Sequence, residues 1–173
     1  KNIERFYRTN RIKWDQFYPS ERYVFEKRCE RAEKLGSVLD VGAAVGGLGL
    51  ALQERFGIES YTGVDINEAA IETAQANTKL PVEAEFIAAD ILDNTDILSG
   101  REFDLVCSLG CADFANDTKR IISECWNYVR PGGALVISLR LTNQKTVLDP
   151  SKSFQWIRFD DDQEKPDDEK ANY

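Results

Sequence analysis

Three aspartates end short apolar runs that recur along the first half of the chain. Asp40 follows SVL, Asp65 ends SYTGVD, and Asp90 ends AEFIAAD. A carboxylate at the end of a buried strand can accept hydrogen bonds from both hydroxyls of a ribose, and Asp65 is the candidate for that role. Asp90 can accept a hydrogen bond from an adenine amino group. These residues predict a ligand that contains adenosine.

A glycine-rich segment directly follows Asp40. Gly42, Gly46 and Gly47 surround two alanines and a valine, and a leucine-rich pattern then begins. Glycine permits a close approach of the backbone to a ligand, and the first turn of a helix offers unpaired N–H groups and partial positive charge. The dinucleotide fingerprint G-x-G-x-x-G requires glycine where this chain has Ala44. The segment predicts a ligand-binding turn, with a purely structural strand-to-helix corner as the alternative.

Two isoleucines complete the predicted adenosine site. Ile66 follows Asp65 and Ile91 follows Asp90, so the two side chains can flank the faces of an adenine ring. An alternative role for Asp65 is to cap the next helix, but Asn67 is better placed for capping. Asp90 alone is an ordinary loop residue. The prediction therefore depends on three loops that lie at the ends of adjacent strands.

Alternating strands and helices must position these residues. Apolar runs predict strands, and helical spacing predicts helices that include 116–129, where Ile121, Cys125 and Trp126 share an apolar face. Near-continuous apolar runs are typical of a parallel sheet covered on both faces. We therefore predict an α/β fold with a doubly wound, mostly parallel, Rossmann-like sheet in three layers. The strands are predicted over 37–41, 60–65, 84–90, 103–110 and 134–140.

The chain divides into three predicted parts. Residues 1–35 form an aromatic-rich helical cap segment, 36–159 form the main domain, and 160–173 form an acidic, exposed tail. The stretch 154–159, FQWIRF, can add a further C-terminal strand. Because no clear ending to a fold is present, we expect the full-length protein to continue.

The composition of the 173 residues excludes several classes of function. The chain has no histidine, which rules out a Ser-His-Asp triad. The four cysteines lack the spacing of a zinc site, so we expect no metal, and reduced cysteines favour a cytoplasmic location. No apolar run approaches the roughly 20 residues that a membrane helix needs. A net charge of −8 argues against a nucleic-acid partner. The sequence does not indicate the oligomeric state.

The ordered motifs resemble those of class I S-adenosylmethionine-dependent methyltransferases. The matching segments are VLDVGAAVG, GVDIN, AADI, FDLVCSLG and VRPGGALVIS, within about residues 36–140. The resemblance implies a methyltransferase with strand order 3-2-1-4-5 and S-adenosylmethionine as cofactor, bound by the 36–159 domain. Ala44 departs from the family's usual glycine. Since this cofactor has no pyrophosphate to hold, the additional methyl group matters less than it would for NAD.

The resemblance also implies which residues bind the cofactor. Asp40 would help to position its amino group, often through water, and the glycine turn would face its methionine part. Ser108 and Leu109 would line the floor near the sulfonium. The implied cofactor-binding residues are Asp40, Gly42, Ala43, Gly46, Asp65, Ile66, Asp90, Ile91, Ser108 and Leu109.

Catalysis by such an enzyme chiefly requires an acceptor held in line with the S–CH3 bond. Asp113 is the candidate base for a hydroxyl acceptor, with a structural role in the loop as the alternative. Arg140 and Thr142 follow the fifth strand and can contact substrate. Three aromatic residues can form a lid or can instead pack the N-terminal segment onto the sheet: Trp14, Phe17 and Tyr18.

The loop after the fourth strand bears on the acceptor. Its sequence, SLGCADF, lacks the Asn/Asp-Pro-Pro-aromatic motif of enzymes that methylate base amino groups in nucleic acids. We therefore predict methyl transfer to a small-molecule or sugar-derived acceptor. The alternatives are an NAD-dependent oxidoreductase, which would share Asp65 and the glycine turn, and a non-catalytic methyltransferase-like binding subunit.

Overall fold

The computed structural model describes residues 6–30, 35–115 and 117–140. The described residues up to Leu139 belong to one compact unit, and Arg140 belongs to a second. The predicted strand 154–159, the acidic tail 160–173 and the substrate candidate Thr142 lie outside the described residues.

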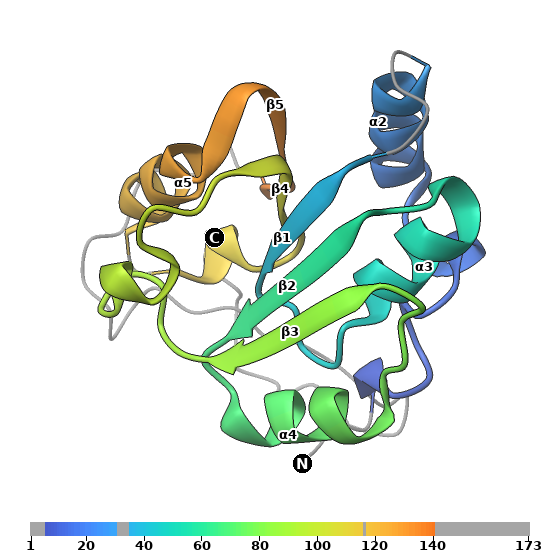
Figure 1. Cartoon of the computed structure of the whole chain (residues 1–173), viewed down its shortest axis with the longest axis horizontal. Coiled ribbons are helices and arrows are strands. Elements are labelled where there is room, and N and C mark those ends of the chain that lie inside the picture. The colour runs from blue at the N-terminus through green and yellow to red at the C-terminus, as the bar shows by residue number, and fades with distance from the viewer. Residues whose placement is uncertain (1–5, 31–34, 116, 141–173) are drawn as a thin grey trace, which may run out of the picture. The chain divides into compact units, whose positions relative to one another are not determined.

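Five parallel strands form a single sheet in the order β3-β2-β1-β4-β5 (Figure 1). The first strand along the chain lies at the centre, so the chain must cross the sheet between β3 and β4. This order and the parallel pairing confirm the predicted α/β, doubly wound fold. The strands are β1 Ser37–Val41, β2 Ser60–Asp65, β3 Glu83–Ala88, β4 Phe103–Ser108 and β5 Val129–Ile137.

Helices connect the strands at the predicted places. The Asn67 side chain caps α4 by accepting a hydrogen bond from the Ala70 amide at 3.2 Å, as its position in the sequence predicts. Asp117 caps α5 in the same way by accepting from the Arg120 amide. The α-helices are α2 Pro19–Cys29, α3 Gly47–Phe56, α4 Glu68–Asn77 and α5 Thr118–Asn127, and the short 3-10 helices are η1 Trp14–Gln16, η2 Thr95–Leu98 and η3 Ala112–Phe114.

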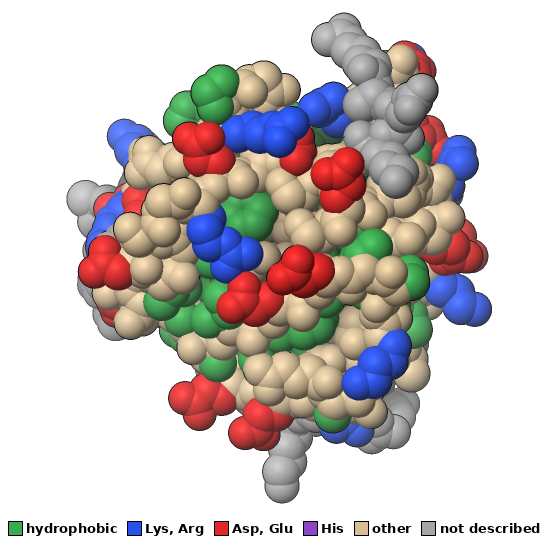
Figure 2. Space-filling view, viewed as in Figure 1, with side chains coloured by type: hydrophobic (Ala, Val, Ile, Leu, Met, Phe, Trp, Pro, Cys, Tyr) green, Lys and Arg blue, Asp and Glu red, His purple; other side chains and the backbone are tan. Residues whose placement is uncertain are grey.

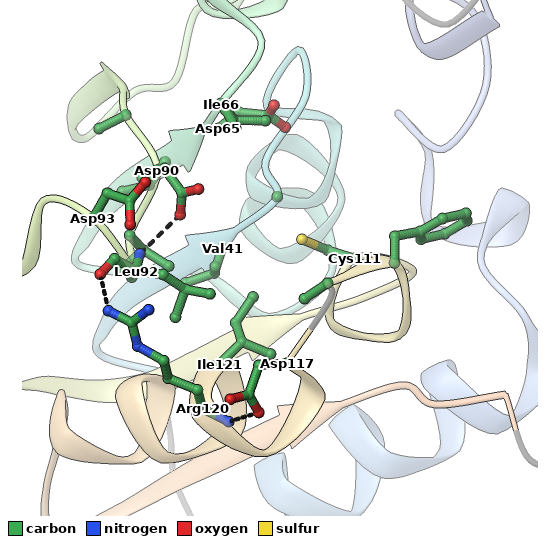
Figure 3. A pocket seen from close by; sticks show the side chains of 16 residues that line it. Val41, Asp65, Ile66, Asp90, Leu92, Asp93, Cys111, Asp117, Arg120 and Ile121 are labelled. Atoms are coloured by element: carbon green, nitrogen blue, oxygen red, sulfur yellow. Dashed lines mark hydrogen bonds between the residues drawn. The ribbon is translucent and has the colours of Figure 1, made fainter. Parts of the chain in front are cut away.

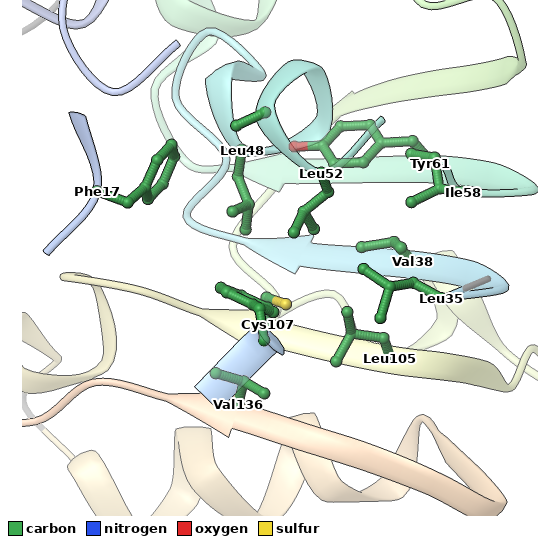
Figure 4. Close-up of a cluster of buried hydrophobic side chains, with 12 residues drawn as sticks. Phe17, Leu35, Val38, Leu48, Leu52, Ile58, Tyr61, Leu105, Cys107 and Val136 are labelled. Atoms are coloured by element: carbon green, nitrogen blue, oxygen red, sulfur yellow. The ribbon is translucent and has the colours of Figure 1, made fainter. Parts of the chain in front are cut away.

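The sheet separates two hydrophobic cores. On β1, Val38 points into one core, called the first core below, which contains Phe25 of α2 and Leu52 of α3 (Figure 4 shows Val38 and Leu52). Leu39 of the same strand belongs to the core on the opposite face, called the second core below, with residues of η2, η3 and α5. Because successive side chains of a strand point to opposite faces, a continuous apolar run serves both cores. The predicted three layers follow directly from this arrangement.

Two local predictions were wrong. Trp126 does not share the buried face of α5, because its side chain is 61% exposed, whereas Cys125 is fully buried. The last strand does not begin at residue 134 as predicted, because β5 begins at Val129 and includes the segment 130–133, RPGG. This segment lies inside β5 as an irregularity, since the pairing moves from Phe103 with Val129 to Leu105 with Ala134. An insertion of this kind keeps the ladder on both sides while the extra residues bulge outward.

Among the residues that the structure describes, no helix combines the length and the apolar character needed to cross a membrane. Nor does any group of three or more cysteine, aspartate or glutamate side chains come together there as a metal site.

Candidate cofactor site

A pocket of about 480 Å³ lies where the C-terminal ends of β1, β2 and β3 approach α5 (Figure 3). This is the position at which doubly wound sheets bind ligands, and the volume falls in the usual range for small-molecule sites. The described lining is Val41, Gly42, Val64, Asp65, Ile66, Ala89, Asp90, Ile91, Leu92, Asp93, Cys111, Phe114, Ala115, Asp117, Arg120 and Ile121.

The glycine-rich loop between β1 and α3 forms one wall of the pocket. Gly42 has φ +86°, and a Cβ atom there would lie 2.6 Å from the Cys111 sulfur. Only glycine therefore allows the loop to approach the segment after β4 so closely. The amides of Gly42 and Ala43 both donate to the Val64 carbonyl, at 2.8 and 3.1 Å, which ties the loop to the end of β2.

Asp65 is held by two backbone amides at the edge of this loop. Its Oδ2 accepts from the Ala44 amide at 2.7 Å, and its Oδ1 accepts from the Asn67 amide at 2.9 Å. The alternative role as a helix cap falls to Asn67. A carboxylate has about four acceptor positions, so each oxygen still has capacity for a ligand hydroxyl. The group is oriented by the backbone and remains able to bind.

Asp90 occupies the turn after β3, across the pocket from α5. Its Oδ1 accepts from the Leu92 amide at 2.8 Å. Ile66 at the end of β2 is 71% exposed, whereas Ile91 is only 3% exposed. An apolar side chain as exposed as Ile66 on a pocket wall is suited to contact with a flat ligand ring.

These features fit the adenosine part of S-adenosylmethionine. The pocket has apolar walls from Val41, Val64 and Ile121 and carboxylates from Asp65 and Asp90 at neighbouring strand ends. Such an arrangement can enclose a base and accept hydrogen bonds from a ribose and an amino group. Of the residues predicted to bind the cofactor, the structure brings five together here: Gly42, Asp65, Ile66, Asp90 and Ile91.

Asp40 points to the opposite face of the sheet from this pocket. Its carboxylate is 3% exposed and accepts a hydrogen bond from the Tyr61 hydroxyl at 2.6 Å. Burial raises the pKa of Asp40 to about 6, and the hydrogen bond from Tyr61 opposes that rise. Asp40 therefore lies beside Tyr61, which belongs to the first core (Figure 4), and is not part of the described pocket lining.

Four other predicted cofactor residues also lie outside the described lining of the pocket. Ala43 is buried beside Gly63, and Gly46 begins α3 as its N-cap residue. Ser108 is fully buried at the end of β4, and Leu109 packs against the first core. Contact of these residues with a cofactor stays a prediction, as it does for Asp40.

The predicted catalytic and lid residues are distributed differently. Asp113 is half-buried in η3, and its neighbours Cys111 and Phe114 contribute to the described pocket lining, whereas Asp113 itself does not. Trp14 packs edge-on against Phe56 with ring centres 4.9 Å apart, and Phe17 is 3% exposed in the first core. These two residues therefore pack the N-terminal segment, and substrate contact by Trp14 stays a prediction.

The remaining two substrate candidates are both exposed. Tyr18 is 67% exposed and lies with its ring 5.5 Å from the Arg11 guanidinium, so it contributes little to the core. Arg140 is exposed at the end of the described chain. Substrate contact by Tyr18, Arg140 and Thr142 stays a prediction.

Sequence analysis named five of the sixteen lining residues, and four of those it missed have side chains that could contact a ligand. They come from the segment after β4 and from α5: Cys111, Phe114, Asp117 and Arg120. Burial raises the pKa of the Cys111 thiol to about 11, so this cysteine stays protonated at neutral pH. The one signal that could have found this group is its position, because the loop after β4 ends beside the glycine turn in a sheet of this order.

The N-terminal segment also makes an unpredicted contact with the glycine loop. The Arg11 guanidinium donates to both carboxylate oxygens of Glu21, at 3.0 and 3.1 Å, and Glu21 also accepts from the Tyr18 amide. The carbonyl oxygen of Arg11 lies against the position that a Cβ of Gly47 would occupy. The segment therefore packs directly on the start of α3.

Residues 38–133 match a family model described as "Methyltransferase domain". The chain belongs to the class I S-adenosylmethionine-dependent methyltransferases. This confirms the predicted family and its cofactor, S-adenosylmethionine, and leaves no support for the NAD-dependent alternative.

Curated relatives and solved structures agree with this membership. The chain is 29% identical over 150 residues to a release factor glutamine methyltransferase of Koribacter versatilis, covering 70% of this chain and 53% of the relative. It is 32% identical over 123 residues to a ubiquinone biosynthesis O-methyltransferase of Pseudomonas entomophila, covering 69% and 51%. This methyltransferase chain thus spans about half the length of the curated relatives it matches.

Two solved methyltransferase structures share the fold. The sugar N-methyltransferase KedS8 from a Streptoalloteichus species is 26% identical with a TM-score of 0.57, covering 73% of this chain and 50% of that one. A methyltransferase from Thiobacillus denitrificans in complex with S-adenosyl-L-homocysteine is 21% identical with a TM-score of 0.54, covering 70% and 48%.

Proposed function

We propose that this chain binds S-adenosylmethionine in the pocket described above and transfers its methyl group to a small-molecule or sugar-derived acceptor. The observation that carries the proposal is the meeting of Gly42, Asp65 and Asp90 on one pocket from three adjacent strand ends. Asp65 accepts hydrogen bonds from the ribose hydroxyls, Asp90 accepts one from the adenine amino group, and Ile66 covers one face of the adenine ring. The glycine loop faces the rest of the cofactor.

The bound cofactor supplies an already activated methyl group on its sulfonium. The protein's own contribution is therefore mainly to orient the cofactor and the acceptor and to exclude water. Cys111 and Phe114 belong to the described pocket lining, and Cys111 packs against Gly42, so we place the acceptor against this part of the lining. Cys111 is protonated at neutral pH and serves there as a small apolar group.

The choice of acceptor class has two supports. One curated relative is an O-methyltransferase of ubiquinone biosynthesis, and a solved structure that is 26% identical is a sugar N-methyltransferase. On the face of the molecule in Figure 2, acidic and basic side chains are interspersed and do not form a broad basic surface. A basic surface is what a nucleic-acid substrate would require.

Cofactor binding is tested by thermal unfolding and calorimetry with S-adenosylhomocysteine and with NAD. At a concentration 100 times the dissociation constant, a ligand of the native state adds about 2.7 kcal/mol of stability. We expect S-adenosylhomocysteine to raise the melting temperature and NAD to leave it unchanged. Well-folded protein that binds no S-adenosylhomocysteine would instead be a non-catalytic binding subunit.

The acceptor is tested by transfer of a labelled methyl group from S-adenosylmethionine, using full-length protein and separate pools of metabolites, glycans and proteins. We expect label in the small-molecule or glycan pools. Label only in protein would contradict the proposed acceptor and would favour an acceptor like that of the release factor glutamine methyltransferase.

A further inference from the structure

Arg120 joins α5 to the turn after β3 at the pocket. Its Nη2 atom donates a hydrogen bond to the carbonyl oxygen of Leu92, which is 28 residues away in the sequence. In Figure 3 the arginine side chain extends from α5 toward the turn that carries Asp90. Both Arg120 and Leu92 belong to the described lining of the pocket.

The backbone of Leu92 is held by two hydrogen bonds, one at its amide and one at its carbonyl. Its amide donates to the Asp90 carboxylate at 2.8 Å, and its carbonyl accepts from Arg120. The backbone of the same turn closes through the Asn94 amide, which donates to the Asp90 carbonyl at 2.9 Å. The position of Leu92 therefore determines where the amide that orients the Asp90 carboxylate lies.

The base of the Arg120 side chain is itself well fixed. The Arg120 amide donates to the cap residue Asp117 at 3.0 Å, and the next residue, Ile121, is 5% exposed in the second core. Within the described parts of the chain, Arg120 forms no ion pair with a carboxylate closer than 4.0 Å. Among the described residues, the carbonyl of Leu92 is thus the hydrogen-bond partner of the guanidinium, and no carboxylate of those residues competes for it.

We propose that Arg120 is a positioning residue for adenine recognition. It holds the turn from Asp90 to Leu92 in the conformation in which the Asp90 carboxylate meets the adenine amino group. The proposal rests on the proposed function, because it assumes that the pocket binds an adenosyl cofactor. It adds a residue from α5, on the far side of the pocket, to the recognition of the base.

The test compares two ligands that differ at the base. S-adenosylhomocysteine has the amino group that donates a hydrogen bond to Asp90, whereas S-inosylhomocysteine has an oxygen at that position of the base. Dissociation constants of both are measured by calorimetry for the wild type, Arg120→Met and Arg120→Lys. Methionine keeps much of the apolar stem but has no donor, and lysine can still donate to a carbonyl. Asp65→Ala is the matched control, because it acts on the ribose and not on the base.

We expect the wild type to prefer S-adenosylhomocysteine by at least about ten-fold, as loss of a hydrogen bond to a charged group implies. In Arg120→Met we expect about five-fold weaker binding of S-adenosylhomocysteine and a smaller ratio between the two ligands. Arg120→Lys should restore part of the ratio. Asp65→Ala should weaken both ligands equally and leave the ratio unchanged.

Two results would overturn the inference, and they are distinguishable. If the wild type binds neither ligand, the proposed function fails and the role of Arg120 fails with it. If the wild type discriminates and Arg120→Met retains the full ratio, the cofactor site stands but Arg120 does not position the turn. Thermal unfolding of each variant shows whether it is folded, and Arg120→Lys provides the comparison if Arg120→Met is not.

Discussion

The amide of Ala44 donates a hydrogen bond to the Asp65 carboxylate at 2.7 Å, and this bond joins the glycine loop to the end of β2. Ala44 reaches Asp65 because its backbone is left-handed, with φ 47°. The family usually has glycine at this position, so the chain keeps an unfavourable conformation for alanine and uses it to orient the carboxylate. The loop and the proposed ribose-binding residue are therefore one structural unit.

Replacement of Asp65 tests that unit. Asp65→Ala removes the acceptor proposed for two ribose hydroxyls, and hydrogen bonds to a charged group are worth about 1.5–3 kcal/mol each. We expect the affinity for S-adenosylhomocysteine to fall on the order of 100-fold in calorimetry. The amides of Ala44 and Asn67 also lose their acceptor, which should lower the free energy of unfolding by about 1–2 kcal/mol.

The matched control is Glu68→Ala, an exposed acidic residue in the first turn of α4, three residues further along the chain. It removes a negative charge near the same strand end but does not line the described pocket. Its affinity should stay within about two-fold of wild type, since the contribution is that of an exposed charge at a helix start. An equal loss of affinity in both variants would mean that Asp65 acts only through its charge.

Substitution of Ala44 tests whether the left-handed backbone is retained at a cost. A left-handed conformation costs alanine about 1–2 kcal/mol, and glycine avoids this cost, although its more flexible unfolded chain offsets part of the gain. We expect Ala44→Gly to raise the free energy of unfolding in urea by about 0.5–1 kcal/mol and to keep cofactor affinity. Ala44→Val should lose stability, because a β-branched residue tolerates positive φ poorly. Loss of affinity in the glycine variant would show that the methyl group contacts the ligand.

The sequence predicted the features of this fold that depend on local pattern. Continuous apolar runs identified the strands, and Asn67 and Gly42 were placed correctly because capping and tight turns depend on a few neighbouring residues. Asp65 and Asp90 were predicted to lie close together because parallel strands bring their C-terminal ends to one edge, and both line the pocket. The face of the sheet to which a residue points was harder to predict. Asp40 points away from the pocket and accepts a hydrogen bond from Tyr61 on the other face.

Contacts between distant segments carried no local signal. Arg120 reaches Leu92 across 28 residues, and Arg11 reaches Glu21 through an irregular turn with Arg11 at φ 58°. Arg120, Arg11 and Glu21 are ordinary surface residue types in the sequence. Their partners depend on how the chain turns between elements, which neither periodicity nor residue type determines.

The Arg11–Glu21 pair should be far more important for stability than exposed pairs of the same chain. The side chain of Glu21 is 7% exposed and that of Arg11 is 18% exposed, and removal of one partner leaves a poorly solvated charge. We expect Glu21→Ala to lower the free energy of unfolding by about 3 kcal/mol. Limited proteolysis should then cut between Phe6 and Tyr18 much faster than in the wild type.

An exposed pair on the same helix provides the control. Lys27 Nζ and Glu30 Oε1 are 2.6 Å apart, and their side chains are 51% and 60% exposed. Glu30→Ala should change the free energy of unfolding by less than about 0.5 kcal/mol, because solvent screens such pairs. Similar losses for Glu21→Ala and Glu30→Ala would contradict a structural role for the buried pair in holding the N-terminal segment on α3.

Asp40 should make the stability of the chain depend on pH in a definite direction. Burial raises the pKa of its carboxyl from 3.8 to about 6, so the folded state binds a proton more tightly than the unfolded state. Its contribution is therefore most favourable below pH 3.8 and is lost as the pH rises through 6. The difference corresponds to about 3 kcal/mol of unfavourable free energy at pH 7.5.

Asp40→Asn cannot ionise and should avoid that cost. We expect the variant to be more stable than the wild type at pH 7.5 in urea unfolding, with the difference shrinking between pH 6 and pH 4 as the wild-type carboxyl becomes protonated. Tyr61→Phe removes the hydrogen bond that favours the charged form, so in that background the same transition should shift to higher pH. A difference between Asp40→Asn and wild type that does not vary with pH would mean that Asp40 titrates alike in the folded and unfolded states.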